Sequence, residues 1–203
     1  MTARTLVSAS AFVVTLLMAG CGGKIKYPNY YALEVVPTPR PPVGAARLAG
    51  TLAVRRFETS PYLRQGRIAY RQAPTEIGFY EYHRWAAEPA ETVTAALIDS
   101  LRASRLFSFV RRYDSQDRQD YLMTGRIERL EEIDYGGGVQ VEAKLSAELI
   151  DLRAGATLWT GEADERVSVD TRKVSAVVAE MSHAVQKSID RLVAGVETQL
   201  QAK

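Results

Sequence analysis

Apolar and polar residues alternate most regularly over Val139–Leu149. Valine, alanine and leucine occupy every second position of this segment, and polar or charged residues occupy the positions between them. Because successive side chains of a strand point to opposite faces, the alternation predicts a strand with one covered and one solvent-facing side. Glycine-containing turns are expected at Gly136–Gly138 before it and at Arg153–Gly155 after it. The pattern therefore places Leu145 on the covered face and Lys144 on the solvent-facing one.

Similar but less regular patterns predict the other strands. Their expected ranges are Asn29–Val35, Leu52–Phe57, Arg67–Arg71, Glu76–Tyr82, Phe107–Tyr113, Tyr121–Ile133 and Thr157–Val169. In the strand Tyr121–Ile133 the apolar parity shifts at Leu130, which predicts a β-bulge near Glu128 and Arg129. The proline-rich segment Pro37–Pro42 predicts a stiff loop.

Two segments have helical spacing. Apolar residues from Val93 to Leu101 share one face of a helix that begins near Pro89, and a longer apolar stripe predicts a closing helix after Asp170, its expected N-cap. Strands joined by tight turns pair antiparallel, so both helices can cover the same face of one sheet. The sequence thus predicts an α+β fold, a two-layer domain with a mainly antiparallel sheet and two helices packed on one face.

The N-terminal segment has a different character from the rest of the chain. A charge-free apolar run, Leu6–Met18, follows Arg4 and leads to the only cysteine, Cys21. As a helix this run covers about 20 Å, less than the roughly 30 Å of a bilayer's hydrocarbon core, but it suits the apolar part of a signal peptide. Met18-Ala19-Gly20-Cys21 resembles the lipobox of bacterial lipoproteins, with Met18 where leucine is commoner. The alternative is an uncleaved anchor helix with a buried free thiol.

The lipobox resemblance implies three parts of the chain. Residues 1–20 would be a signal peptide, residues 21–28 a lipidated tether, and residues 29–203 a single domain. Cys21 would carry covalent diacylglycerol and an N-acyl chain, which together anchor far more firmly than one chain. In lipoproteins of Gram-negative bacteria, aspartate after the cysteine commonly signals inner-membrane retention. Gly22 stands there, so the resemblance implies the periplasmic face of the outer membrane.

Charge and residue types exclude several functions. Net charge is +2, and the arginines are interspersed with acids, so no basic face for nucleic acid is expected. His83 and His183 are the two histidines, too few for a zinc site when the cysteine is lipidated. Glu131 and Glu132 are neighbours on a strand, point to opposite faces and cannot share acid–base chemistry. We therefore expect no enzymatic activity, no metal and no cofactor besides the acyl chains.

Aromatic residues concentrate between residues 62 and 85. Such residues are enriched at the centres of protein interfaces, although they can equally fill a core, which is the favoured interpretation for Tyr70 and Trp85. Tyr62 and Leu63 follow a proline in an expected turn, where a large ring would meet water or a partner. The candidate partner contacts are Tyr62, Leu63, Tyr82 and Trp85.

Four motifs in order are similar to those of the ABC-type transport auxiliary lipoproteins. They are Asn29–Leu33, Ser60–Leu63, Arg67–Tyr70 and Trp85–Pro89 before a helix. The resemblance covers nearly the whole chain. It departs at Ala90, where the family commonly has leucine after the proline.

The resemblance implies a non-enzymatic component of an intermembrane phospholipid transport system in Gram-negative bacteria. The chain would dock the periplasmic assembly, built from an MCE-domain protein, at the outer membrane, while an ABC transporter supplies the energy. A second function stays open, that of a lipid- or lipopolysaccharide-binding assembly lipoprotein. A carrier needs an apolar cavity between its layers, whereas a docking subunit has a filled core. The sequence also leaves a homo-oligomer open.

Overall fold

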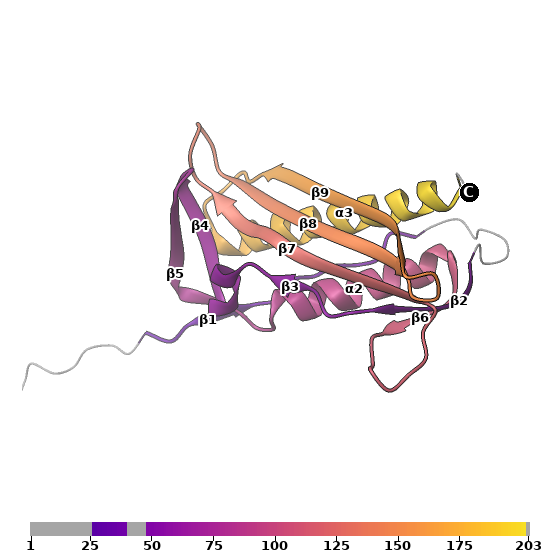
Figure 1. The fold of residues 1–203 in the computed structure, drawn as a ribbon. Coiled ribbons are helices and arrows are strands. Elements are labelled where there is room, and N and C mark those ends of the chain that lie inside the picture. The colour runs from indigo at the N-terminus through magenta and orange to yellow at the C-terminus, as the bar shows by residue number, and fades with distance from the viewer. Residues whose placement is uncertain (1–25, 40–47, 202–203) are drawn as a thin grey trace, which may run out of the picture.

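The computed structural model describes residues 26–39 and 48–201. Cys21 and the expected signal peptide lie outside this part of the chain. The described residues form one sheet with two helices, α2 (Pro89–Ser104) and α3 (Val174–Gln201), packed against one of its faces (Figure 1). The α+β two-layer fold expected from the sequence is confirmed.

The sheet contains nine strands within the described residues. They are β1 (Asn29–Tyr31), β2 (Leu48–Val54), β3 (Glu58–Thr59), β4 (Arg67–Ala73), β5 (Glu76–Trp85), β6 (Phe107–Arg112), β7 (Tyr121–Ile133), β8 (Gln140–Asp151) and β9 (Ala156–Ser168). The longest ladders are antiparallel and join β7, β8 and β9, and β4 and β5 form an antiparallel hairpin.

Shorter parallel ladders complete the sheet. β2, β3 and β4 follow one another along the same edge of β7 and all pair with it in parallel. β6 pairs in parallel with β2, and β1 with β5. Antiparallel pairing therefore occurs where a tight turn joins two strands, and parallel pairing between strands that a long stretch of chain separates, such as β2 and β6.

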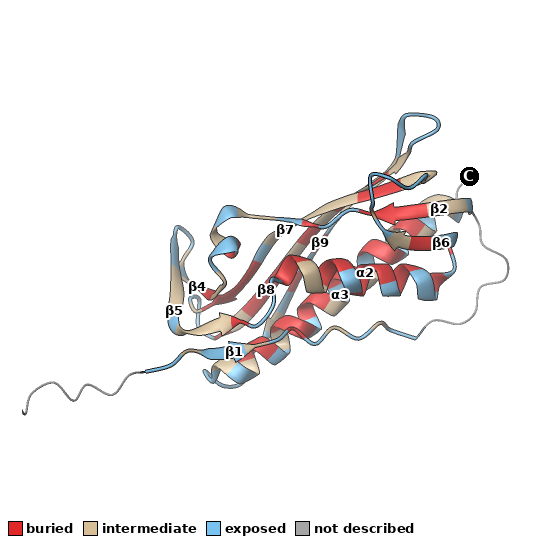
Figure 2. Cartoon of the chain, turned by 90° about the horizontal axis from the view of Figure 1, so that it is seen from below, coloured by how far each residue is buried: buried red, intermediate tan, exposed pale blue. Residues whose placement is uncertain are grey.

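The register of the long strands follows the hydrophobic pattern. Leu145 is fully buried, while Lys144 is partly exposed on the other face. The pairing of β7 with β8 shifts between Ile127 and Arg129, which confirms the predicted bulge, and this shift keeps Leu130 in the core. Figure 2 shows the buried positions gathered between the sheet and the helices.

Large side chains fill the space between the two layers. The largest fully buried ones are Leu52, Phe57, Ile68, Leu97, Leu101, Leu106, Met123, Ile127, Leu130, Leu145, Leu149 and Met181. At Gly125 an added Cβ would lie less than 3.0 Å from the ring of Phe57, and at Gly161 less than 3.0 Å from the ring of Trp159. Gly195 of α3 lies against Trp159 as well. Gly125 and Gly161 therefore leave the space in which the rings of Phe57 and Trp159 pack.

The start of the closing helix differs from the prediction. α3 begins at Val174, and the backbone amides of Ala176 and Val177 donate to the carbonyl of Lys173. Asp170 lies before this first turn, so its assignment as N-cap was wrong. The apolar stripe located the helix, but polar residues on either side of a helix start do not by themselves fix its first residue.

Candidate functional site

Two of the four candidate partner contacts belong to the core. Pro61–Gln65 form a short 3-10 helix, η2, which directs Leu63 inward and leaves it 2% exposed. Trp85 ends β5 opposite Tyr31 of β1 and is 6% exposed. The prediction that Leu63 and Trp85 face a partner was therefore wrong, because both side chains already pack within the domain.

Tyr62 is half-buried and connects η2 to β7 instead of projecting from a turn. Burial, together with the neighbouring carboxylate of Glu131, raises the pKa of the Tyr62 hydroxyl above its ordinary value. Glu131 has a fully buried side chain, accepts a hydrogen bond from Nε of Arg71 at 2.6 Å and another from its Nη2 at 3.1 Å. This two-point geometry holds the buried carboxylate in place. Tyr62 thus covers a structural ion pair, contrary to the expectation of an exposed ring.

Tyr82 lies partly exposed on β5, close to where the chain enters the domain. The Nζ atom of Lys26 lies 4.6 Å from the centre of its ring, a cation–π geometry. A hydrogen bond with Glu81 raises the pKa of the Tyr82 hydroxyl. Of the four candidates, Tyr82 is the one whose surroundings match a surface contact.

The remaining aromatic residues of this end form a row of rings. Ring centres are 5.1 Å apart for Tyr70 and Tyr80, 5.5 Å for Tyr80 and His83, and 5.5 Å for His83 and Tyr31. The Tyr31 hydroxyl and Nδ1 of His83 are hydrogen-bonded at 2.9 Å, and Tyr80 donates to Glu132 at 2.7 Å. These contacts support the expectation that His83 and Tyr70 pack within the domain.

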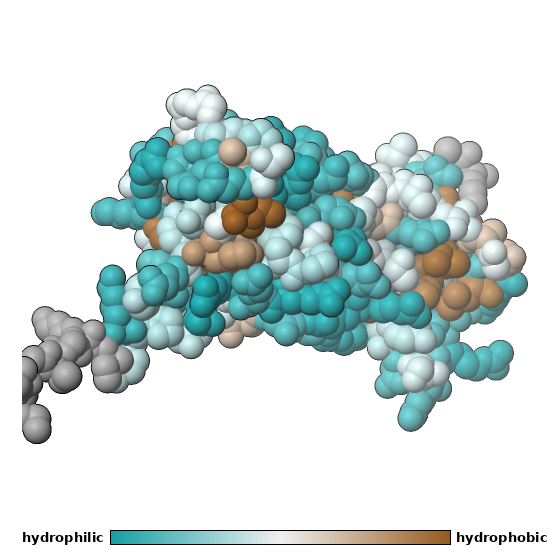
Figure 3. All heavy atoms as spheres, turned by 60° about the vertical axis from the view of Figure 1, so that its left-hand side comes forward, coloured by the Kyte–Doolittle hydropathy of each residue, from teal (hydrophilic) through white to brown (hydrophobic). Residues whose placement is uncertain are grey.

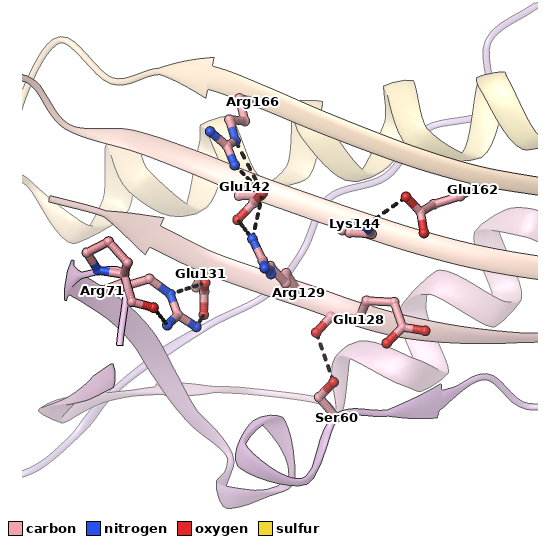
Figure 4. Close-up of polar contacts among 10 residues, drawn as sticks. Ser60, Arg71, Glu128, Arg129, Glu131, Glu142, Lys144, Glu162 and Arg166 are labelled. Atoms are coloured by element: carbon pink, nitrogen blue, oxygen red, sulfur yellow. Dashed lines mark hydrogen bonds and ion pairs between the residues drawn. The ribbon is translucent and has the colours of Figure 1, made fainter. Parts of the chain in front are cut away.

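The sheet face opposite the helices carries paired charges (Figure 4). Glu142 of β8 has a side chain with 0% exposure and accepts hydrogen bonds from Arg129 of β7 and Arg166 of β9. Burial would raise the pKa of the Glu142 carboxyl, but the hydrogen bonds from Arg166 and Arg129 outweigh it and hold the pKa below its ordinary value. Next along the strands, Lys144 pairs with Glu162 at 2.7 Å. We call this uncovered side of β7, β8 and β9 the open face.

A groove of about 670 Å³ crosses the open face between these strands and the segment after β2. Its walls include arginine and glutamate side chains as well as the hydroxyl groups of threonine and serine. The lining residues used below are Arg55, Arg126, Ser146, Glu148, Thr160 and Glu162. Among the described residues, no three His, Cys, Asp or Glu side chains are grouped to hold a metal ion. A groove with charges of both signs suits a polar protein surface better than an acyl chain.

Sequence reasoning missed the three-residue cluster around Glu142. The alternation in β8 placed Glu142 on the solvent-facing side, but it could not show that arginines from both neighbouring strands bury it. The register of β8 against β7 and β9 brings Arg166 beside it, and the β7 bulge brings Arg129 within reach. The spacing of arginines on two strands gives a signal only once that register is known.

Fold and surface together define a small α+β domain with a packed core and a polar open face. No helix in the described part of the chain is both long and apolar enough to cross a bilayer. The chain belongs to the family of ABC-type transport auxiliary lipoprotein components, which it matches over residues 31–193. The family resemblance read from the sequence is confirmed. No curated protein matches the sequence.

Solved structures share the fold. Protein XCC0632 from Xanthomonas campestris, a DUF330 protein, superimposes with a TM-score of 0.74 at 20% identity, covering 86% of this chain and 98% of its own. The hypothetical protein CT253 from Chlamydia trachomatis gives a TM-score of 0.55 at 10% identity, covering 77% of this chain and 100% of its own. At these identities the similarity shows a common fold.

Proposed function

We propose that this chain is a non-enzymatic lipoprotein of an MCE-type phospholipid transport system, anchored through Cys21 at the periplasmic face of the outer membrane. In this role it docks the periplasmic MCE-domain assembly at that membrane. Membership of the transport auxiliary lipoprotein family supports the general role. The MCE partner and the outer-membrane location are the proposed refinements.

The packed core is the observation that favours docking over lipid carriage. A carrier holds acyl chains in an apolar cavity, but here the buried ring of Phe57 and the partly buried ring of Trp159 pack against Gly125 and Gly161. The groove of about 670 Å³ on the open side of β7, β8 and β9 is open to the surface and is lined by charged side chains. The alternative of a lipid- or lipopolysaccharide-binding assembly factor therefore has less support.

The short tether keeps the domain near the membrane. The described chain begins at Lys26, five residues after Cys21, and this distance in sequence spans at most about 18 Å. β1 then joins the sheet beside β5 (Figure 1). The end of the sheet formed by β1, β4 and β5, together with η2, is thus the end nearest the anchor. We call it the tether end.

The open face is the surface we propose for the MCE partner. The helices cover the opposite side of the sheet, so β7, β8 and β9 present the largest uncovered part of it. Charged groups of both signs line the groove there, and complementary charges at interfaces set orientation and specificity. Thr160 is exposed within this groove and offers a position for a probe.

Affinity purification with photo-cross-linking tests this proposal. The tagged chain is extracted from membranes in mild detergent, with a photoreactive amino acid at Thr160 or, as a control, at His183 on the exposed side of α3. We expect an MCE-domain protein to copurify and to cross-link at Thr160 but not at His183.

The two parts of the proposal fail separately. Purified material without an MCE-domain protein would contradict the function itself. Copurification with cross-links at His183 instead of Thr160 would keep the function and move the docking surface to the helices.

A further inference from the structure

Two arginines face each other at the tether end. Arg67 of β4 is paired with Arg84 of β5, and Tyr30 of β1 is paired with Arg84 from the other side. Directly paired residues project from the same face of a sheet, so the two guanidinium groups share one surface. Like charges opposite each other destabilise a sheet unless an anion lies nearby.

No carboxylate of the described residues neutralises this pair. Neither Arg67 nor Arg84 has an ion pair or a side-chain hydrogen bond there, and both are partly exposed. Arg64, at the end of η2 and three residues before Arg67, is exposed and likewise has no acidic partner among the described residues. Outside the tether end, arginines of the sheet such as Arg129 and Arg166 are matched with glutamates. Arg64, Arg67 and Arg84 thus place unneutralised positive charge at the tether end, where β5 also carries Glu76 and Glu81.

Tyrosines lie at the same end of the molecule as the arginine pair. Tyr30 is 64% exposed and Tyr27 is 77% exposed, and Tyr82 lies under Lys26. Tyrosine with lysine or arginine is the combination found at the level of lipid headgroups, where a ring meets apolar material and its hydroxyl meets water. Figure 3, which turns the β4 and β5 side forward, shows a mostly hydrophilic surface on which the hydrophobic atoms form separate small patches. Such a surface suits contact with headgroups better than insertion among acyl chains.

We propose that Arg67 and Arg84 bind the phosphate groups of anionic phospholipids in the membrane that holds the anchor. The inference rests on the proposed lipid anchor at Cys21. The tether of at most about 18 Å places the arginine pair within reach of the headgroups. A guanidinium group matches a phosphate with two parallel hydrogen bonds, which an ammonium group cannot do. Phosphate binding also relieves the repulsion between the two arginines and fixes the rotation of the domain about its tether.

Arginine footprinting of the mature, lipidated chain tests the contact. The chain is reconstituted into vesicles of phosphatidylcholine alone or of phosphatidylcholine mixed with phosphatidylglycerol, and hydroxyphenylglyoxal modification is mapped by mass spectrometry. We expect Arg67 and Arg84 to react about fivefold more slowly in the anionic vesicles, the factor that corresponds to about 1 kcal/mol per basic residue at an anionic surface. Raising the salt to about 1 M, where the screening length is about 3 Å, removes this protection.

Arg105 and Arg118 provide the internal control. Both are exposed, and neither has an ion pair within the described residues. Arg118 lies in the connection from β6 to β7, at the opposite end of the molecule from β1 (Figure 1). Their rates should be equal in the two kinds of vesicle. In an Arg67→Gln variant the protection of Arg84 should fall, whereas Arg118→Gln should leave it unchanged.

Flotation of the vesicles separates the two levels of the proposal. A chain that floats with neither kind of vesicle overturns the anchor and this inference with it. A chain that floats, but in which Arg67 and Arg84 react equally fast in both kinds of vesicle, overturns the headgroup contact alone. Equal protection in both kinds of vesicle that arises only when the MCE-domain protein is added would assign the arginine pair to a protein partner and overturn the proposal.

Discussion

Gly125→Ala is the change that probes the packed core most sharply. Gly125 lies in the middle of β7, and the ring of Phe57 occupies the place where a side chain would start. An added Cβ would lie less than 3.0 Å from the nearest ring atoms, whereas ordinary contacts begin at 3.4 Å. Phe57 is 1% exposed and its backbone amide donates to Thr94 of α2 at 3.0 Å, so the ring cannot swing into solvent.

The magnitude follows from this overlap. Overpacking a well-filled core by a methyl group costs about 1–3 kcal/mol. Replacing glycine by alanine at a compatible backbone position returns only about 0.4–1 kcal/mol through the unfolded chain. The steric effect therefore exceeds the entropic one, and we expect a net loss of stability of about 1–2 kcal/mol, or roughly 2–6 °C in melting temperature.

Thermal and urea unfolding, followed by circular dichroism, measure the loss. Gly138→Ala is the matched control, because no atom lies within 4 Å of its added Cβ and its backbone needs no positive φ. Phe57→Ala should cost about 3–5 kcal/mol alone, and the double variant should cost at least 0.5 kcal/mol less than the two single variants together, since the new methyl enters the space left by the ring. An unchanged melting temperature for Gly125→Ala, or strict additivity, would refute the packed arrangement.

Three further changes test the sheet, each by thermal unfolding. Leu145→Asp buries an unpaired charge and should cost several kcal/mol, whereas Lys144→Gln on the open face should change little; similar losses for both would contradict the register of β8. Glu142 should stabilise the fold above pH 4.5, and this stabilisation should be lost as the pH falls through its lowered pKa. In Glu142→Gln the melting temperature should therefore fall less on acidification than in the unaltered chain. Burial raises the pKa of Glu132, so its charge opposes folding at neutral pH; Glu132→Gln, which can still accept from Tyr80, should raise the melting temperature at pH 7 and not at pH 4.

The local periodicity of apolar residues predicted most of the fold. The faces of β7 and β8, the β7 bulge and the existence of both helices follow from patterns within a few residues, and burial enforces them. The parallel ladders of β2, β3 and β4 with β7 could not be predicted in this way, because long connections determine them. Strand alternation says which face a residue occupies but not which strand lies beside it.

The candidate site was harder to predict for the same reason. A proline turn was expected to expose Tyr62 and Leu63, but it tightens into η2, whose short pitch directs Leu63 into the core. The Tyr62 hydroxyl then lies beside Glu131, a contact between residues far apart in sequence. The arginine pair at the tether end could not be predicted either, because Arg67 and Arg84 become neighbours only through the pairing of β4 with β5.

Membrane fractionation of the Cys21→Ser variant tests whether the chain is a lipid-anchored docking subunit of the outer membrane. For the unaltered chain, we expect a mature form that begins at Cys21, incorporates a palmitate analogue, sediments with the outer membrane and brings the MCE-domain protein with it. Cys21→Ser should leave a larger precursor in the inner membrane, without the label and without the partner. Unchanged size, labelling and outer-membrane sedimentation of the variant would show that Cys21 is not the site of a lipid anchor.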